Sequence, residues 1–274
     1  MCAVQETGLT HLAFGAAAFQ AKDAGWKALF HGPFPLAKKR ATPVGGKEYR
    51  DSALSAAGGV AILTKGRPAA RFDVPTHPSR DRFWDVLLGS KRWNAVGVTL
   101  PNNSALFVHN VYLPTRARQN QECRSQAEEI LRAAFLAAST HGGAPALVCG
   151  DTNMAPQDSE VIQAALASGL WHDVIDAFAH LPSTKERVHA PSPTHFPTNL
   201  TWATKEEGCR IDRIIVNTPA LRIISDAWTI PKRVSGGHLP LCVRFDLDAA
   251  AEKGLVLEMP QGVPLPVHSQ ETLP

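Results

Sequence analysis

Paired cysteines are missing from this chain of 274 residues. No CxxC pair occurs and the cysteine spacing is irregular, which excludes the common zinc-site patterns and argues against a disulfide framework. The five cysteines are Cys2, Cys123, Cys149, Cys209 and Cys242. We therefore expect reduced thiols and an intracellular protein, either nuclear or cytoplasmic.

Long apolar runs are missing as well. No run approaches the roughly 20 apolar residues that a membrane-spanning helix needs. The N-terminus does not resemble a signal peptide, because Gln5 and Glu6 come before an apolar region could form. The sequence therefore predicts a soluble protein without a membrane partner.

The sequence also has little excess charge. Its net charge of +3 at neutral pH is far below that of a dedicated non-specific DNA binder. The charge therefore decides little, whereas 44% hydrophobic residues are enough for a sizeable core.

Short apolar runs recur along the chain, and several are bounded by Gly, Pro or Asn, which predicts strands. They are residues 58–63, 95–100, 105–112, 146–149, 211–216 and 241–247. Helical spacing predicts one helix over about 120–138 and another that begins after an N-cap at Asp158 and ends near Gly169. Strands with single helices between them predict an α/β layered sandwich.

Two regions lack such patterns. Residues 32–55 combine prolines and glycines with Lys38, Lys39 and Arg40, which predicts a long basic loop. Residues 249–274 hold four prolines and little periodicity. We expect them to form a flexible tail after a single domain that spans residues 1–248.

Polar residues follow the apolar run that ends in Gly150-Asp151-Thr152-Asn153. Asp151 could orient an attacking water or accept its proton, and Asn153 could donate its amide to a phosphate oxygen. An Asx turn that only closes a strand explains the same residues. This segment alone leaves both interpretations open.

Two further segments carry ionisable residues beside apolar strands. Asp212 lies between Arg210 and Arg213 in an otherwise apolar run, and an unpaired buried carboxylate there would be costly. His238 follows two glycines directly before another strand. A salt-bridged surface strand and a structural histidine remain the alternatives for each segment read alone.

In this order, the segments resemble the endonuclease/exonuclease/phosphatase superfamily, whose usual signatures are Gln-Glu-Thr, Asn-x-Tyr-x-Pro, Gly-Asp-x-Asn, Ile-Asp-x-Ile and Ser-Asp-His-x-Pro. The matching segments are Val4-Gln5-Glu6-Thr7, Asn110-Val111-Tyr112-Leu113-Pro114, Gly150-Asp151-Thr152-Asn153, Ile211-Asp212-Arg213-Ile214 and Ser235-Gly236-Gly237-His238-Leu239-Pro240. Each motif alone is weak, whereas five in register over residues 4 to about 247 are specific. The resemblance implies a four-layered α/β sandwich of two mostly antiparallel sheets flanked by helices.

The resemblance also implies catalytic roles. Glu6 would be the main protein ligand of Mg²⁺, or of Mn²⁺, because these hard cations prefer carboxylate oxygens. Asp151 would orient or deprotonate the attacking water. Asp212 would pair with His238 so that the ring contacts the phosphate, and Tyr112 would hydrogen-bond the phosphate from the opposite side.

Three further residues are implied to contact the substrate. Asn153 would hold a phosphate oxygen, and Asn110 belongs to the same strand-end motif as Tyr112. Trp202 lies where nuclease relatives often place an aromatic that touches nucleic acid. A buried core tryptophan remains the alternative for Trp202.

Two departures from the family pattern have consequences. Met1 lies only five residues before Glu6, so we expect the family's first strand, with its asparagine near the metal, to be lacking. Gly237 occupies the position of the aspartate in Asp-His. Both changes predict weaker metal binding, because removing such partners commonly costs about 10- to 100-fold in affinity or activity.

The leading interpretation is a Mg²⁺-dependent phosphodiester hydrolase, an endonuclease that acts on DNA as a monomer. Tyr112 favours the nuclease branch, since the sphingomyelinase and inositol-phosphatase branches carry Asn-Thr-His at that strand end. One alternative is a catalytically impaired pseudoenzyme or fragment that acts as a binding module. Another is a phosphatase for a small or lipid phosphate.

Overall fold

The computed structural model describes residues 1–5, 7, 11–31, 59–66, 69–72, 74, 81–115, 117–196, 208–232 and 237–251. Within them, a six-stranded sheet has the order β4-β5-β6-β7-β9-β8. Its strands are β4 (Ala69–Arg71), β5 (Trp93–Thr99), β6 (Ala105–Tyr112), β7 (Ala146–Asp151), β8 (Trp171–Asp173) and β9 (Asp212–Asn217). Only β6 and β7 run parallel, because the helix α3 (Gln121–Ser139) carries the chain back between them.

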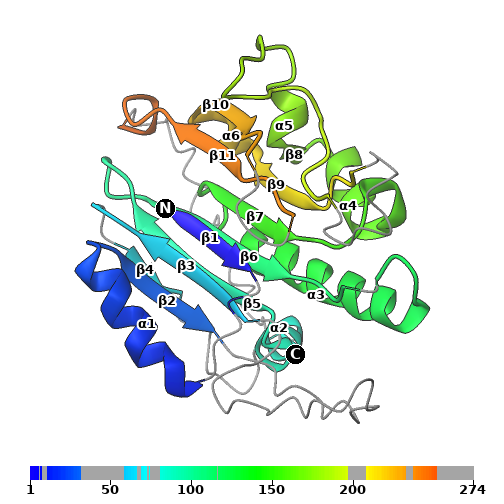
Figure 1. Cartoon of the computed structure of the whole chain (residues 1–274), viewed down its shortest axis with the longest axis horizontal. Coiled ribbons are helices and arrows are strands. Elements are labelled where there is room, and N and C mark those ends of the chain that lie inside the picture. The colour runs from blue at the N-terminus through cyan, green and yellow to red at the C-terminus, as the bar shows by residue number, and fades with distance from the viewer. Residues whose placement is uncertain are drawn as a thin grey trace, which may run out of the picture.

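Two smaller antiparallel sheets complete the strand layers (Figure 1). One has the order β1-β3-β2 and the other pairs β10 with β11. Their strands are β1 (Cys2–Gln5), β2 (Lys27–His31), β3 (Val60–Thr64), β10 (Ile224–Thr229) and β11 (Leu241–Phe245). One apolar cluster joins residues of β3, β5, β6, β7 and β10, so these sheets pack on the same face of the six-stranded sheet.

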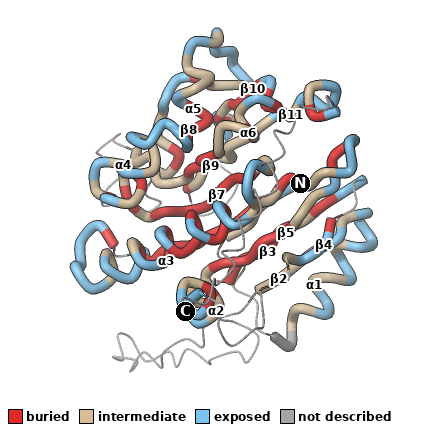
Figure 2. The backbone as a smooth tube through the Cα atoms, turned by 180° about the vertical axis from the view of Figure 1, so that it is seen from behind, coloured by how far each residue is buried: buried red, intermediate tan, exposed pale blue. Residues whose placement is uncertain are grey.

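Helices cover the outer faces. α1 (His11–Asp23) packs beside β2, while α2 (Phe83–Ser90), α3 and α4 (Glu160–Ala167) share a second apolar cluster with β5, β6 and β7. The shorter elements are α5 (Val174–Ala177), α6 (Thr218–Arg222), η1 (Pro156–Asp158) and η2 (Ala249–Ala251). Figure 2 shows buried residues concentrated along the central strands and on one side of α3.

The two clusters show the two-residue alternation of a sheet that is covered on both faces. On β6, Leu106 and Val108 face the smaller sheets, whereas Val111 faces the helices. On β7, Leu147 and Cys149 face the smaller sheets, whereas Val148 faces the helices. This alternation directs Tyr112 and Asp151, at the ends of these strands, into the space between the sheets.

Local signals explain the two predicted helices. α3 begins after Asn120, whose side chain accepts the backbone N–H of Cys123 at 3.0 Å. α4 begins after Ser159, whose hydroxyl oxygen accepts the N–H of Ile162 at 3.1 Å. The predicted N-cap at Asp158 is therefore wrong by one residue, because Asp158 belongs to η1 and Ser159 has the extended backbone of a cap.

The α/β sandwich with flanking helices is confirmed, and each predicted apolar run overlaps an observed strand. The helices α1 and α2 and the strands β2, β4, β8 and β10 were not predicted. The predicted basic loop and residues 252–274 of the predicted tail lie outside the described residues. Within the described ranges, no helix combines the length and apolar character needed to cross a bilayer.

Candidate active site at the strand ends

Two carboxylates meet where β7 and β9 pair. Asp151 and Asp212 are direct cross-strand partners in the antiparallel register. Tyr112, at the end of β6, is the parallel partner of Asp151. Like charges directly opposite each other destabilise a strand pair. A charge of opposite sign nearby is therefore needed to offset the repulsion between these carboxylates.

His238 supplies a hydrogen-bonding partner for Asp212 of this pair. Its Nδ1 atom lies 2.9 Å from Oδ2 and 3.1 Å from Oδ1 of Asp212. An ionised carboxylate only accepts hydrogen bonds, so Nδ1 carries the donated proton. This fixes the tautomer and places Nε2 on the other side of the ring. Both side chains are partly exposed.

The Gly-Asp-x-Asn segment forms an Asx turn whose geometry also orients the carboxylate. Oδ1 of Asp151 accepts the backbone N–H of Asn153 at 2.9 Å, and Asp151 is buried with 4% exposure. Asn153 has a positive φ of 50°, which asparagine tolerates better than most residues. Its Nδ2 donates to the carbonyl of Leu113 at 2.9 Å, so the side chain is anchored beside β6. The Asx turn and the proposed catalytic role are therefore not exclusive, because the turn itself holds the Asp151 carboxylate in place.

Thr194 fixes the backbone that carries Asp212, and sequence reasoning did not identify it. Its fully buried hydroxyl oxygen accepts the N–H of Ile211 at 3.1 Å and that of Asp212 at 3.0 Å. Its carbonyl accepts the N–H of Leu239 at 2.6 Å. One threonine thus holds both halves of the Asp212–His238 pair. A threonine among prolines has no periodic signal that could have revealed this.

His195 supports His238 directly. The two residues form an antiparallel bridge, and their ring centroids are 4.5 Å apart at an angle of 53°. The N–H of Phe196 donates to the carbonyl of Gly237 at 3.0 Å. Backbone hydrogen bonds therefore hold the chain directly before and directly after His238.

Tyr112 is buried with 3% exposure at the end of β6. The guanidinium of Arg92 lies 5.1 Å from its ring centroid, and Arg92 Nη1 donates to the Tyr112 carbonyl at 3.3 Å. A guanidinium over an aromatic face is attracted by the ring electrons. Arg92 is thus a second residue near the strand ends that no motif indicated.

Asn110 lies in the interior with 0% exposure. Its Nδ2 donates to the carbonyls of Val4 at 3.2 Å and Ala61 at 3.1 Å, and its Oδ1 accepts Nε2 of Gln5 at 2.6 Å. Both amide donors are therefore used within the protein. These bonds make Asn110 a link between β6 and the smaller sheet, not a group directed at a substrate.

The donor set fits a divalent cation. Among the described residues, the ligand atoms of Asp151, Asp212 and His238 form a group within 4.8 Å of one another. Two carboxylates suit a hard cation such as Mg²⁺ or Mn²⁺. Because His238 Nδ1 is hydrogen-bonded to Asp212, the carboxylate oxygens are the better ligands. The predicted ligand Glu6 and the predicted contact Trp202 lie outside the described residues.

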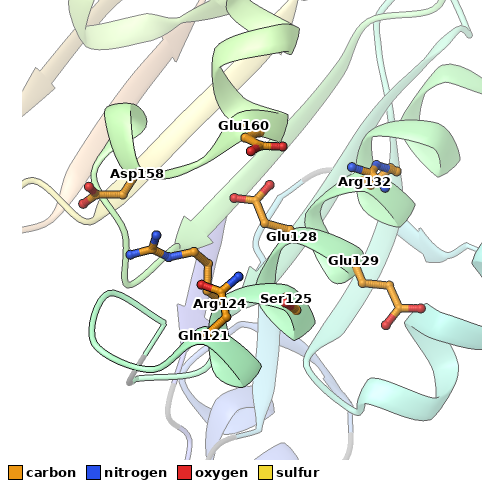
Figure 3. Close-up of a pocket in the computed structure, with 8 residues that line it drawn as sticks. All are labelled: Gln121, Arg124, Ser125, Glu128, Glu129, Arg132, Asp158 and Glu160. Carbon is orange, nitrogen blue, oxygen red and sulfur yellow. The ribbon is translucent and has the colours of Figure 1, made fainter.

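A polar pocket of about 510 Å³ lies on the helical side of the molecule (Figure 3). Its lining comes from α3, η1 and α4, and includes Glu128, Glu129, Asp158 and Glu160. None of the residues that line it belongs to the Asp151–Asp212–His238 group. This pocket is therefore separate from the candidate active site.

The sequence profile of the Endonuclease/Exonuclease/phosphatase family matches residues 1–235. No curated protein sequence matches the chain. Solved structures with a similar fold include the following three, at 16–18% identity. A 3'-5' exonuclease from Neisseria meningitidis has 18% identity and TM-score 0.56, and the match covers 89% of this chain and 88% of that one. An AP endonuclease from Archaeoglobus fulgidus has 16% identity and TM-score 0.56 at the same coverages. The Xenopus laevis APE2 catalytic domain has 17% identity and TM-score 0.61, and the match covers 89% of this chain and 82% of that one.

Proposed function

This chain belongs to the Endonuclease/Exonuclease/phosphatase family, and from that premise we propose that it is a divalent-metal-dependent phosphodiester hydrolase whose substrate is DNA. The observation that carries the proposal is the Asp212–His238 hydrogen bond of 2.9 Å beside the Asp151 carboxylate. Each member comes from a different motif. Their convergence is the arrangement that acid–base chemistry at a phosphate requires.

Each side chain of the site would have a separate role. Asp151 would orient a water molecule and accept its proton, because its carboxylate is oriented by the Asn153 N–H. The His238 Nε2 atom would face a phosphoryl oxygen, with Asp212 stabilising the positive charge on the ring. Tyr112 and Asn153 would complete the contacts to the phosphate group.

Carboxylates of Asp151 and Glu6 would hold Mg²⁺ or Mn²⁺, which when bound offsets the charge that develops on phosphate oxygens. The close carboxylates of Asp151 and Asp212 support this assignment, since a cation relieves their repulsion. Mg²⁺ is the proposed physiological ion.

The proposal of DNA rests on the proteins with similar folds. One is described as an AP endonuclease, and another as a 3' phosphatase bound to a product DNA hairpin. Tyr112 at the end of β6 agrees with the nuclease branch. A monomeric state and an intracellular location stay predictions of the sequence.

A second candidate function is a pseudoenzyme that binds nucleic acid without cleaving it. Gly237 favours this alternative, because it replaces a carboxylate of the family pattern next to His238. If it is correct, the purified chain binds DNA and shows no metal-dependent cleavage.

Cleavage of supercoiled plasmid and of an abasic-site duplex tests the proposal. With Mg²⁺ we expect nicking that EDTA abolishes and that Asp151→Asn lowers by about 100-fold or more, since general base catalysis typically contributes 10²–10⁴-fold. Turnover of inositol phosphates or sphingomyelin, but not DNA, would support the small-phosphate alternative instead.

Glu160→Gln and Glu129→Gln are matched controls for this experiment. Both remove an exposed carboxylate from the polar pocket in Figure 3, away from the strand ends. We expect them to keep the activity of the original chain. If wild-type protein does not nick either substrate, the hydrolase proposal is wrong.

A further inference from the structure

Behind the site, on the opposite face of β9, lies a group of four charged side chains. Asp173 and Arg213 are buried, whereas Arg210 is partly exposed and Asp176 is exposed. Adjacent residues of a strand point to opposite faces, so Arg213 points away from the side that Asp212 faces. Arg213 Nη1 lies 2.7 Å from Oδ2 of Asp173, and the two side chains are 2% and 1% exposed. Burying two charges is costly unless hydrogen bonds compensate.

Asp173 makes the hydrogen bonds that compensate. Its Oδ1 accepts from Arg210 Nη2 and from the backbone N–H of Ile175, which it caps at the start of α5. Nη1 of Arg210 donates to Oδ1 of Asp176 at 2.7 Å. Arg213 Nη2 also donates to the carbonyl of Arg210 at 3.0 Å. The group holds two cations and two anions and is therefore neutral as a whole.

This group holds the two ends of the segment that contains Asp212. Arg210 and Arg213 flank Ile211 and Asp212 in the chain. From the other side, Thr194 accepts the N–H groups of Ile211 and Asp212. Thr152 donates its N–H and its hydroxyl to the Ile211 carbonyl, at 2.8 and 2.7 Å. Thr194 and Thr152 thus hold the backbone of Ile211 and Asp212, in addition to the arginines on either side of it in the chain.

We propose that Asp173 is a positioning residue of the active site, which anchors Arg210 and Arg213 and thereby keeps the Asp212 carboxylate against His238. The inference deepens the proposed hydrolase function and rests on it for its kinetic consequence. Asp173 does not touch the substrate. It acts through the backbone of residues 210–213, which joins the two arginines to Asp212.

A purely structural role predicts the same loss of stability without a specific effect on the site, so a matched control is needed. Asp226 is also buried, with 8% exposure, and bonds His189 at 2.9 Å and Arg187 at 3.3 Å. It lies on β10, which pairs with β11 and not with the site's strands. Asp226→Asn therefore removes a comparable buried charge that has no hydrogen bond to Arg210 or Arg213 among the described residues.

The experiment compares Asp173→Asn with Asp226→Asn well below their unfolding temperatures. For Asp173→Asn we expect kcat on plasmid to fall about 10- to 100-fold with KM nearly unchanged, as when a supporting partner of a site residue is lost. The low-field proton NMR signal of His238 Nδ1–H, assigned by its absence in His238→Gln, should shift or broaden. Asp226→Asn should leave both readouts as in the wild type.

Equal kinetics and an unchanged Nδ1–H signal in the two variants would overturn the proposal. Arg210→Gln is a milder variant, because it removes one arm and leaves the Arg213–Asp173 pair intact, and it should give an intermediate effect if Asp173→Asn does not fold. If the wild type lacks hydrolase activity, the NMR comparison still tests the positioning role. The failure of the function and the failure of this inference are therefore distinguishable.

Discussion

At the scale of single residues, the site depends on which side chains carry charge and which backbone angles they need. Asp151 and Asp212 face each other across a strand pair, and Nδ1 of His238 lies 2.9 Å from Oδ2 of Asp212. Gly237 next to His238 has a φ of +87°, a region that glycine adopts without strain. Its conformation matters for any attempt to restore the family's aspartate.

Gly237→Asp should therefore have two opposing effects. A side chain at this φ costs about 1–2 kcal/mol, which corresponds to a Tm lower by roughly 2–8 °C in a chain of this size. The added carboxylate should strengthen Mg²⁺ binding at the Asp151 side. Thermal unfolding with and without MgCl₂ measures both effects.

Gly237→Ala is the control, because it introduces the same strain without the carboxylate. We expect both variants to lose similar stability without metal, and only the aspartate variant to recover it with MgCl₂. Identical behaviour of the two variants in MgCl₂ would show that this position does not contribute to metal binding.

At the scale of elements, the site requires β6 and β7 to lie close together. Gly150 has a φ of +143°, and a Cβ atom built there would lie 1.8 Å from the carbonyl oxygen of Val111. The N–H of Leu113 donates to the Asp151 carbonyl at 2.9 Å, directly beyond this contact. The parallel pair therefore accepts only glycine directly before Asp151.

Gly150→Ala should destabilise the protein by about 3 kcal/mol or more, since overpacking and an unfavourable φ both contribute. Gly143→Ala is the matched control, because a Cβ there meets nothing within 4 Å. Its stability should change by less than about 0.5 kcal/mol. Urea unfolding of both variants measures the difference, and equal midpoints would contradict the packing argument.

At the scale of the whole molecule, the sheet and its helical cover are joined by two histidines, of which one is fully buried. His109 on β6 is fully buried, accepts Trp93 Nε1–H at Nδ1 over 3.2 Å, and has Nε2 3.1 Å from Nε2 of His141. The His141 ring stacks on Phe107 with centroids 3.5 Å apart. Burial lowers the pKa of His109 from 6.5 to about 3, and that of His141 to about 4.

These shifts predict that stability falls as the pH is lowered. In the unfolded chain both histidines take up protons near pH 6.5, whereas in the folded protein they stay neutral down to about pH 4, so the unfolded state binds more protons. Stability is fully present above pH 6.5 and decreases below it. His109 alone contributes up to about 1.4 kcal/mol per pH unit, and the half-exposed His141 contributes less because of solvent screening.

Urea unfolding between about pH 7 and about pH 5, above most carboxylate titrations, measures this slope. His109→Gln should flatten it by about one proton, because Gln does not titrate in this range. His180→Gln is the control, since His180 is exposed. An unchanged slope in His109→Gln would mean that His109 is already protonated in the fold.

How much of this molecule could be predicted from sequence depends on the range of the interactions. A short apolar run was enough to predict the strand over residues 105–112, which matches β6 residue for residue, and helical spacing was enough to predict α3 after Asn120. The order of five motifs was enough to assign the family. These properties depend on neighbours in the chain, whose spacing the sequence states directly.

Only the tertiary structure decided the contacts between distant segments. It turned Asn110, expected at the substrate, into a buried link to Val4 and Ala61, more than forty-five residues away in the chain. It also revealed Thr194 beside Asp212, and the pairing of Asp173 with Arg213. Such contacts form because several strands pack at one edge and bury polar atoms there. A buried polar atom without a hydrogen bond is costly, and its partner comes from a distant segment that no local pattern specifies.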